Sequence, residues 1–203
     1  MNIKSILAIP FAKSVVKRIY KWAYNPVKTQ DKVMEKLLSK AKFTSFGKDH
    51  NFSSIKNYGD FKTNIPIRDY EGLRPYVDRV VAGESNVLWK GKPLYFAKTS
   101  GTTSGTKYIP LTKASMPEHI KGARNALLMY INRKKKANFV EGKMIFLQGS
   151  PELNEKNGVK VGRLSGISAH YVPGYLQKNR LPSWETNCIE DWETKVEKVI
   201  DET

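Results

Sequence analysis

The sequence is poor in cysteine and has no long apolar run. Its single cysteine, Cys188, excludes a disulfide framework and a zinc site built from cysteines. One cysteine also fits a reducing compartment, so we expect a cytoplasmic protein. No stretch approaches the roughly 18 apolar residues that a membrane-spanning helix requires. With 40% hydrophobic and 11% aromatic residues, the 203-residue chain has the composition of a globular protein.

Acidic residues are also scarce. The chain has 19 acidic against 35 basic residues, which gives a formal net charge of +16 at pH 7. Such an excess often indicates nucleic-acid binding. The lysines are scattered, however, and the one dense cluster, Arg133-Lys134-Lys135-Lys136, ends a predicted helix, where cations complement the helix dipole. We therefore expect no specific nucleic-acid partner.

The first thirty residues contain no acidic residue. From Pro10 onward, apolar residues recur at helical spacing and basic residues lie mostly opposite, which predicts an amphipathic helix. Its apolar stripe is Ala12, Val15, Val16, Ile19, Tyr20 and Ala23. Two interpretations stay open: the stripe docks the helix on the domain, or residues 1–23 contact an anionic membrane. We expect the first of these.

Small and hydroxyl residues make up residues 99–105, which follow an apolar run ending at Ala97. Such a loop can turn its backbone N–H groups toward one point, because glycine tolerates positive φ and close approach. The hydroxyls add donors and a lysine adds a mobile positive charge. The pattern therefore predicts a polyphosphate-binding loop rather than a flexible linker. Its predicted binding residues are Thr99, Ser100, Gly101, Thr102, Thr103, Ser104, Gly105 and Lys107.

This loop is not a Walker P-loop. That motif needs four residues between its glycines, followed by lysine and then serine or threonine. Here three residues separate Gly101 and Gly105, Thr106 stands in the place of the lysine, and Tyr108 follows Lys107. The dinucleotide-binding and kinase glycine patterns fail as well. The spacing thus assigns the loop to none of these three nucleotide-binding motifs.

Helical stripes alternate with short apolar runs bounded by turns, which predicts an α/β fold with helices packed on a central β-sheet. We expect helices over residues 10–23, 29–42, 53–62, 70–81, 113–135 and 191–202. We expect strands over residues 87–89, 94–97, 143–148 and 159–163, with 143–148 buried. Residues 44–50 are expected to form a loop, and no linker is long enough to divide domains.

Ordered motifs over roughly residues 30–185 resemble the auxin-responsive acyl-acid amido synthetases, a family within the adenylate-forming superfamily of acyl-CoA synthetases and luciferases. The matching motifs are Phe46-Gly47-Lys48-Asp49-His50, Ile65-Pro66-Ile67, Asp69-Tyr70-Glu71, Leu73-Arg74-Pro75-Tyr76, Gly83-Glu84, Leu88-Trp89, Phe96-Ala97-Lys98-Thr99-Ser100-Gly101-Thr102-Thr103-Ser104-Gly105 and Lys107-Tyr108-Ile109-Pro110. A resemblance in this order is more specific than a lone glycine motif.

The resemblance implies ATP and Mg²⁺, a carboxylic acid activated as its acyl-adenylate, and attack by an amine or amino acid. The family's loop commonly has one more residue before its lysine. Its adenine-binding motif, Mg²⁺ ligand, ribose-binding aspartate and mobile C-terminal domain match nothing in this chain. We therefore expect residues 1–203 to be the N-terminal portion of the large adenylation domain, with residues 1–28 as an N-terminal helical region, and to be inactive alone.

Within that reading, the helix expected from Lys113 can line the acyl pocket through Asn125, Leu128 and Met129, although plain core packing explains Leu128 and Met129 better. His119 and His170 have no nucleophile or metal partner at a recognisable spacing. We assign no catalytic residue from the sequence, and we predict no metal-ligating residue in this chain. Two other classes stay open: a non-catalytic nucleotide- or partner-binding module, and a basic peripheral protein on membrane or nucleic acid.

Overall fold

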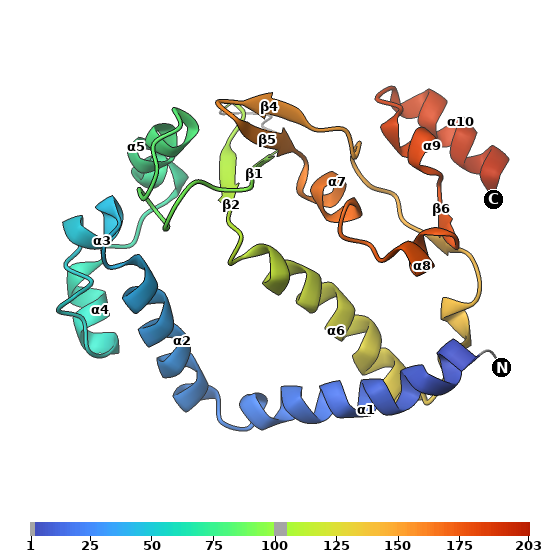
Figure 1. The fold of residues 1–203 in the computed structure, drawn as a ribbon, viewed down its shortest axis with the longest axis horizontal. Helices are drawn as coiled ribbons and strands as arrows, with labels where there is room; N and C mark the ends of the chain where they lie inside the picture. The colour runs from blue at the N-terminus through green and yellow to red at the C-terminus, as the bar shows by residue number, and fades with distance from the viewer. Residues whose placement is uncertain (1–2, 100–104) are drawn as a thin grey trace. The chain divides into compact units, whose positions relative to one another are not determined.

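The computed structural model describes residues 3–99 and 105–203. Its helices are α1 Ile3–Ala23, α2 Pro26–Ala41, α3 Ser45–Asp49, α4 Tyr58–Asn64, α5 Tyr70–Val81, α6 Met116–Lys134, α7 Leu164–Ala169, α8 Gly174–Gln177, α9 Trp184–Cys188 and α10 Trp192–Glu202, with a 3-10 helix, η1, at Asn138–Val140. Its strands are β1 Tyr95–Lys98, β2 Tyr108–Leu111, β3 Met144–Ile145, β4 Asn154–Lys156, β5 Val159–Gly162 and β6 Arg180–Leu181. This mixture of helices and sheet confirms the α/β class (Figure 1).

The chain forms two compact units, each assembled from separate stretches of sequence. Unit 1 contains residues 1–20, 114–154 and 161–203, and unit 2 contains residues 21–113 and 155–160. Because the stretches interleave along the chain, no single linker marks the division. None of the helices in residues 3–99 and 105–203 is long and apolar enough to cross a membrane.

The core of unit 1 lies between α1 and α6 (Figure 1). The buried cluster there contains Ala12, Val15, Ile19, Leu128, Ile131 and Ala137. Val16 is also buried, so four of the residues predicted for the apolar stripe of α1 are buried, as expected. The predicted start of this helix at Pro10 is wrong, because α1 begins at Ile3 and contains Pro10. Pro10 is exposed within this helix.

In unit 2, the second helix begins earlier than predicted, because Pro26 rather than Thr29 opens it. On this helix Leu38 and Ala41 are buried, while Val33 and Leu37 are half exposed. The loop expected at residues 44–50 contains a helix, α3, which is capped by Thr44 and closely packed at Gly47. A Cβ on Gly47 would lie 2.1 Å from the carbonyl oxygen of Ala41.

Helix α5 has the predicted bounds, Tyr70–Val81. The Asp69 carboxylate caps it by accepting a hydrogen bond from the N–H of Gly72 at 2.8 Å. Val77, Val80 and Val81 are buried. The helix is therefore anchored by its C-terminal half, while its first turn stays closer to the surface.

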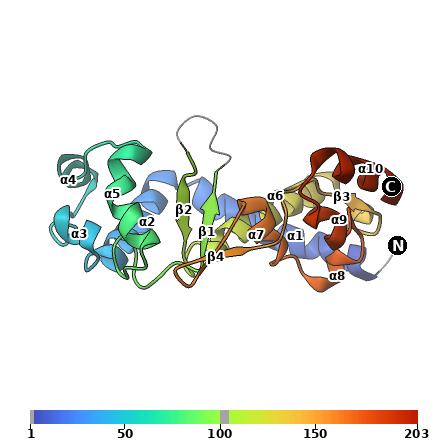
Figure 2. The same ribbon diagram turned by 90° about the horizontal axis from the view of Figure 1, so that it is seen from above.

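The strand predicted at residues 87–89 is absent from the described structure. Instead, the carbonyl groups of Asn86 and Val87 accept hydrogen bonds from the N–H groups of Ser45 and Phe46, at the start of α3. The strand predicted at 94–97 is confirmed as β1, which pairs antiparallel with β2, as Figure 2 shows. These strands belong to a four-stranded sheet in the order β2-β1-β5-β4.

The strand predicted at residues 143–148 is shorter and more exposed than expected. Only Met144 and Ile145 form a strand, β3, which pairs parallel with β6 in a second, two-stranded sheet. Ile145, Phe146 and Leu147 are 56%, 44% and 62% exposed. The prediction of a buried strand was wrong because β3 has a neighbour on one edge alone in the described part of the chain.

Candidate functional site

The predicted phosphate loop joins β1 to β2 in a hairpin. Ser100, Gly101, Thr102, Thr103 and Ser104 lie outside the described residues. The two ends of the loop are described. The backbone N–H of Thr99 donates to the carbonyl oxygen of Lys107 at 3.1 Å, which extends the β1–β2 ladder beyond the pair Lys98 and Tyr108. Gly105 has a φ of +78°, in the region that glycine adopts without strain.

Helix α5 holds the end of the loop that leads into β2. The hydroxyl of Tyr70 accepts a hydrogen bond from the backbone N–H of Tyr108 at 2.9 Å. The same hydroxyl lies 3.4 Å from the carbonyl oxygen of Tyr108. Tyr70 was not predicted as a site residue, because 38 positions separate the two tyrosines and no local pattern joins them.

Lys107 lies among charged and aromatic side chains of the first turn of α5. Its Nζ is 3.6 Å from Oε1 of Glu71 and 5.0 Å from the centre of the Tyr70 ring. Glu71 also pairs with Arg74 at 3.1 Å, and the pKa of Arg74 is raised by its hydrogen bond to Glu71. The side chains of Glu71 and Arg74 are 47% and 55% exposed, and that of Lys107 is 31% exposed, so both ion pairs contribute little to stability. They do place the ammonium group of Lys107 at the base of the loop.

A second lysine contacts the strand that leads away from the loop. Lys156 of β4 has its Nζ 4.7 Å from the centre of the Tyr108 ring, and that ring also meets Phe96 edge-on. Sequence reasoning missed Lys156, because it lies far from Tyr108 in the sequence and no local pattern joins them. Lys107 and Lys156 therefore place two ammonium groups beside the start of β2, and positive charge of this kind favours a phosphate ligand.

The three residues predicted for the acyl pocket do not share one environment. Leu128 is 7% exposed and packs in the α1–α6 core, whereas Met129 is 41% exposed. Asn125 is half-buried, and its side-chain oxygen accepts a hydrogen bond from Arg124 at 3.1 Å. Core packing accounts for the position of Leu128. A role in substrate binding stays a prediction for all three.

The histidines and the cysteine occupy structural or surface positions. The ring of His170 has its Nε2 2.8 Å from the carbonyl oxygen of Pro151 and meets Trp184 edge-on. His119 is exposed on α6. Cys188 is half-buried, and burial raises the pKa of its thiol, which disfavours the reactive thiolate.

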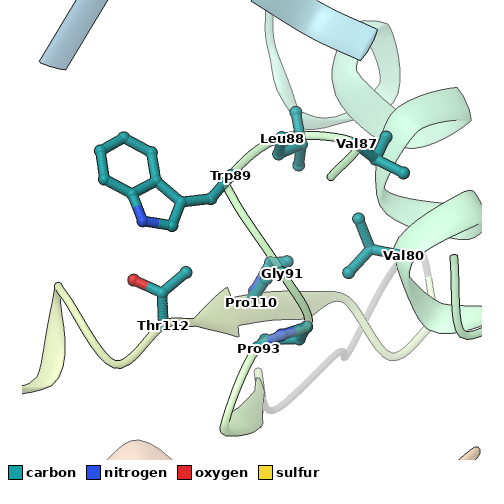
Figure 3. A pocket seen from close by; sticks show the side chains of 8 residues that line it. All are labelled: Val80, Val87, Leu88, Trp89, Gly91, Pro93, Pro110 and Thr112. Carbon is teal, nitrogen blue, oxygen red and sulfur yellow. The ribbon is translucent and has the colours of Figure 1, made fainter. Parts of the chain in front are cut away.

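Unit 2 also contains a small apolar cavity of about 110 Å³ (Figure 3). Its lining residues are Val80 of α5, Pro110 of β2, and Val87, Leu88, Trp89, Gly91, Pro93 and Thr112. Small-molecule sites usually enclose about 300–1,000 Å³. This volume is well below that range, so we assign no ligand to the cavity.

The described residues contain no group of three histidine, cysteine, aspartate or glutamate side chains able to hold a metal ion. We assign no Mg²⁺ ligand among them and derive no step through the metal.

Comparisons with known proteins agree with the motifs. Indole-3-acetic acid-amido synthetase GH3.15 of Arabidopsis thaliana is 33% identical over 141 residues, which cover 68% of this chain and 23% of that protein. Jasmonoyl-L-amino acid synthetase JAR4 of Nicotiana attenuata is 26% identical over 138 residues, covering 66% of this chain and 23% of its own length. The chain thus spans 23% of the length of each of these two relatives.

The fold is shared with a solved structure as well. The structure of GH3.15 acyl acid amido synthetase matches with a TM-score of 0.70 and 22% identity, covering 88% of this chain and 32% of that one. At this identity the match shows the fold. The family model described as the GH3 family N-terminal domain matches residues 15–199, which is most of the sequence. The chain therefore belongs to the GH3 family, through its N-terminal domain.

Proposed function

We propose that this chain supplies the phosphate-binding loop of an enzyme that activates a carboxylic acid with ATP and joins it to an amine or amino acid. The observation that carries the proposal is the β1–β2 hairpin, whose loop of small and hydroxyl residues is closed by the bond between Thr99 and Lys107. The names of the relatives, which are amido synthetases and a ligase, support the reaction class.

In the first step of the proposed reaction, an oxygen of the substrate carboxylate attacks the α-phosphorus of ATP, and pyrophosphate leaves. In the second step, the amine nitrogen attacks the acyl carbon, AMP leaves with the bonding electron pair, and the nitrogen loses a proton. Backbone N–H groups and hydroxyls of the loop would hold the β- and γ-phosphates as leaving group, and Lys107 would offset their charge.

We infer further that the remaining parts of the proposed site lie outside the described residues. These parts include the Mg²⁺ ligands and most of the residues that select the acid and the amine. Asn125, Leu128 and Met129 would contribute a share of the acyl pocket from this chain. A cytoplasmic location is supported by the single cysteine. A screen of acids and amino acids with the 203-residue chain alone should yield no amide product, and robust amide formation would contradict this inference.

Exchange of labelled pyrophosphate into ATP tests the proposal on the complete gene product. Exchange that depends on a carboxylic acid is the expected result, because acyl-adenylate formation is reversible. ATP binding without exchange would favour a non-catalytic nucleotide-binding module. Binding of anionic vesicles or DNA that falls steeply with salt, in place of ATP binding, would favour the peripheral membrane or nucleic-acid reading, with residues 1–23 as its contact.

A further inference from the structure

A backbone N–H on the outer edge of β2 is hydrogen-bonded to a side chain from another element. Strand β2 is terminal in the order β2-β1-β5-β4, so its outward backbone groups face no neighbouring strand among residues 3–99 and 105–203. The N–H of Tyr108 instead donates to the hydroxyl of Tyr70 at 2.9 Å, a normal length for such a bond. The Tyr70 side chain is half-buried, which shields this bond from competing water.

The same tyrosine also contacts the lysine that precedes Tyr108. The ring of Tyr70 lies 5.0 Å from the ammonium group of Lys107, within the range of a cation–π interaction. Tyr70 therefore holds the chain at two points around Lys107. Its hydroxyl binds the backbone N–H of the next residue, Tyr108, and its ring lies against the ammonium group of Lys107. A lysine side chain is a flexible point charge, so where it acts depends on how its base and its end are held.

We propose that Tyr70 is a positioning residue that sets Lys107 for a phosphate of ATP. This rests on the proposed function of the loop. Loss of the hydroxyl leaves the N–H of Tyr108 to water and frees the strand that begins at the loop. Lys107 then spends less time at the phosphate, and ATP binds more weakly, although Tyr70 itself does not touch the nucleotide.

The test replaces Tyr70 by phenylalanine, which keeps the ring and removes the hydroxyl. Tyr76→Phe is the matched control, because Tyr76 lies on the same helix and its hydroxyl donates to Asp49 at 2.8 Å, away from Lys107. On the complete gene product, Tyr70→Phe should weaken ATP binding about five- to tenfold, the loss expected for one hydrogen bond. The KM for the amino acid should stay unchanged, and Tyr76→Phe should leave ATP affinity unchanged.

A second measurement reports on the hydrogen bond between Tyr70 and Tyr108 without any nucleotide. In Tyr70→Phe the backbone amide of Tyr108 should exchange with deuterium faster than in the parent chain, and in Tyr76→Phe it should not. The double variant Tyr70→Phe/Lys107→Ala completes the test. If Tyr70 acts through Lys107, the double variant binds ATP no more weakly than Lys107→Ala alone.

The outcomes separate this inference from the proposed function. If Lys107→Ala and Gly105→Val weaken ATP binding but Tyr70→Phe does not, the role of Tyr70 is overturned and the loop keeps its function. Fully additive losses in the double variant also overturn it. If none of these variants changes ATP binding, the loop does not bind phosphate, and both proposals fail.

Discussion

The backbone N–H of Thr99 and the carbonyl oxygen of Lys107 are joined by a hydrogen bond of 3.1 Å. This bond lies one step beyond the last pair of the β1–β2 ladder, Lys98 and Tyr108. It fixes the two ends of the predicted phosphate loop relative to each other, so the sheet does not depend on what the loop contains. Substitutions within the loop should therefore change ligand binding more than they change stability.

Replacing Gly105 by valine should weaken ATP binding more than any single loss of charge. Gly105 has a φ of +78°, and no atom of the described residues lies within 4 Å of the place where a Cβ would be, so the cost comes from the backbone conformation. Gly105→Asn should be milder, because asparagine tolerates left-handed backbone better than valine. ATP affinity and pyrophosphate exchange of the complete gene product are the measurements.

Gly158→Val is the matched control for this comparison. Gly158 has the same φ of +78° and equally open surroundings, but it lies in the turn between β4 and β5. It should lower the melting temperature and leave ATP affinity unchanged. Normal affinity and exchange in Gly105→Val would show that the loop is a linker.

Lys107→Ala should weaken ATP binding less than Gly105→Val. One charge-assisted contact is worth about 1.5–3 kcal/mol, or roughly ten- to a hundredfold in affinity. Isothermal titration with ATP at low and high salt checks this, because the loss should shrink as salt screens the charge. A loss that salt does not change would indicate that Lys107 acts through packing instead.

Glu71→Gln should strengthen ATP binding by up to about fivefold. The carboxylate of Glu71 lies 3.6 Å from Nζ of Lys107 and would compete with phosphate for it, and an exposed ion pair is worth at most about 1 kcal/mol. Glu84→Gln is the control, because Glu84 pairs with Arg79 instead. Weaker binding in Glu71→Gln, measured by the same titration, would mean that Glu71 helps to orient Lys107.

The buried face of α1 should be structural. Ile19 is 9% exposed in the core of unit 1, so Ile19→Ala should lower the free energy of unfolding by about 2 kcal/mol, whereas Leu7→Ala on the exposed face should change it little. Deletion of residues 1–24 should lower the melting temperature. Unchanged stability together with lost binding to anionic vesicles would support the membrane interpretation.

Glu202 should make the stability of unit 1 depend on pH. Burial alone raises the pKa of its carboxyl, but hydrogen bonds from the Thr186 hydroxyl and the Ser183 N–H, each 2.6 Å, lower it by more. With the folded pKa depressed, this stabilisation is complete above the unfolded pKa of roughly 4.3 and is lost as pH falls through the folded value.

Glu202→Gln should therefore lower the free energy of unfolding at pH 7 by about 1 kcal/mol and flatten its decline in acid. Denaturant titrations between pH 3 and pH 7 measure both effects. Glu197→Gln, an exposed position on the same helix, is the control. Parallel pH profiles for Glu202→Gln and the parent chain would show that these hydrogen bonds do not set the pH dependence.

Local signals predicted two capped helices well. Asp69 and Asp191 cap α5 and α10 through the N–H groups of Gly72 and Thr194, and both helices lie within about a residue of their predicted bounds. The loop at 44–50 was predicted wrongly, because a five-residue helix has too short a period to be read from apolar spacing. The strand at 143–148 was predicted too long, since apolar residues signal burial only where a neighbour covers them.

By itself, the sequence determined the α/β class, the family and the position of the loop, because caps, turns and ordered motifs act between residues close in the chain. Tertiary structure alone decided which side chains surround Lys107. Tyr70 and Glu71 lie more than thirty positions before it, and Lys156 of β4 contacts the ring of the next residue, Tyr108. The contacts of Tyr70 and Glu71 exist because α5 packs beside β2. That long-range arrangement depends on burial over the whole unit, and no local pattern encodes it.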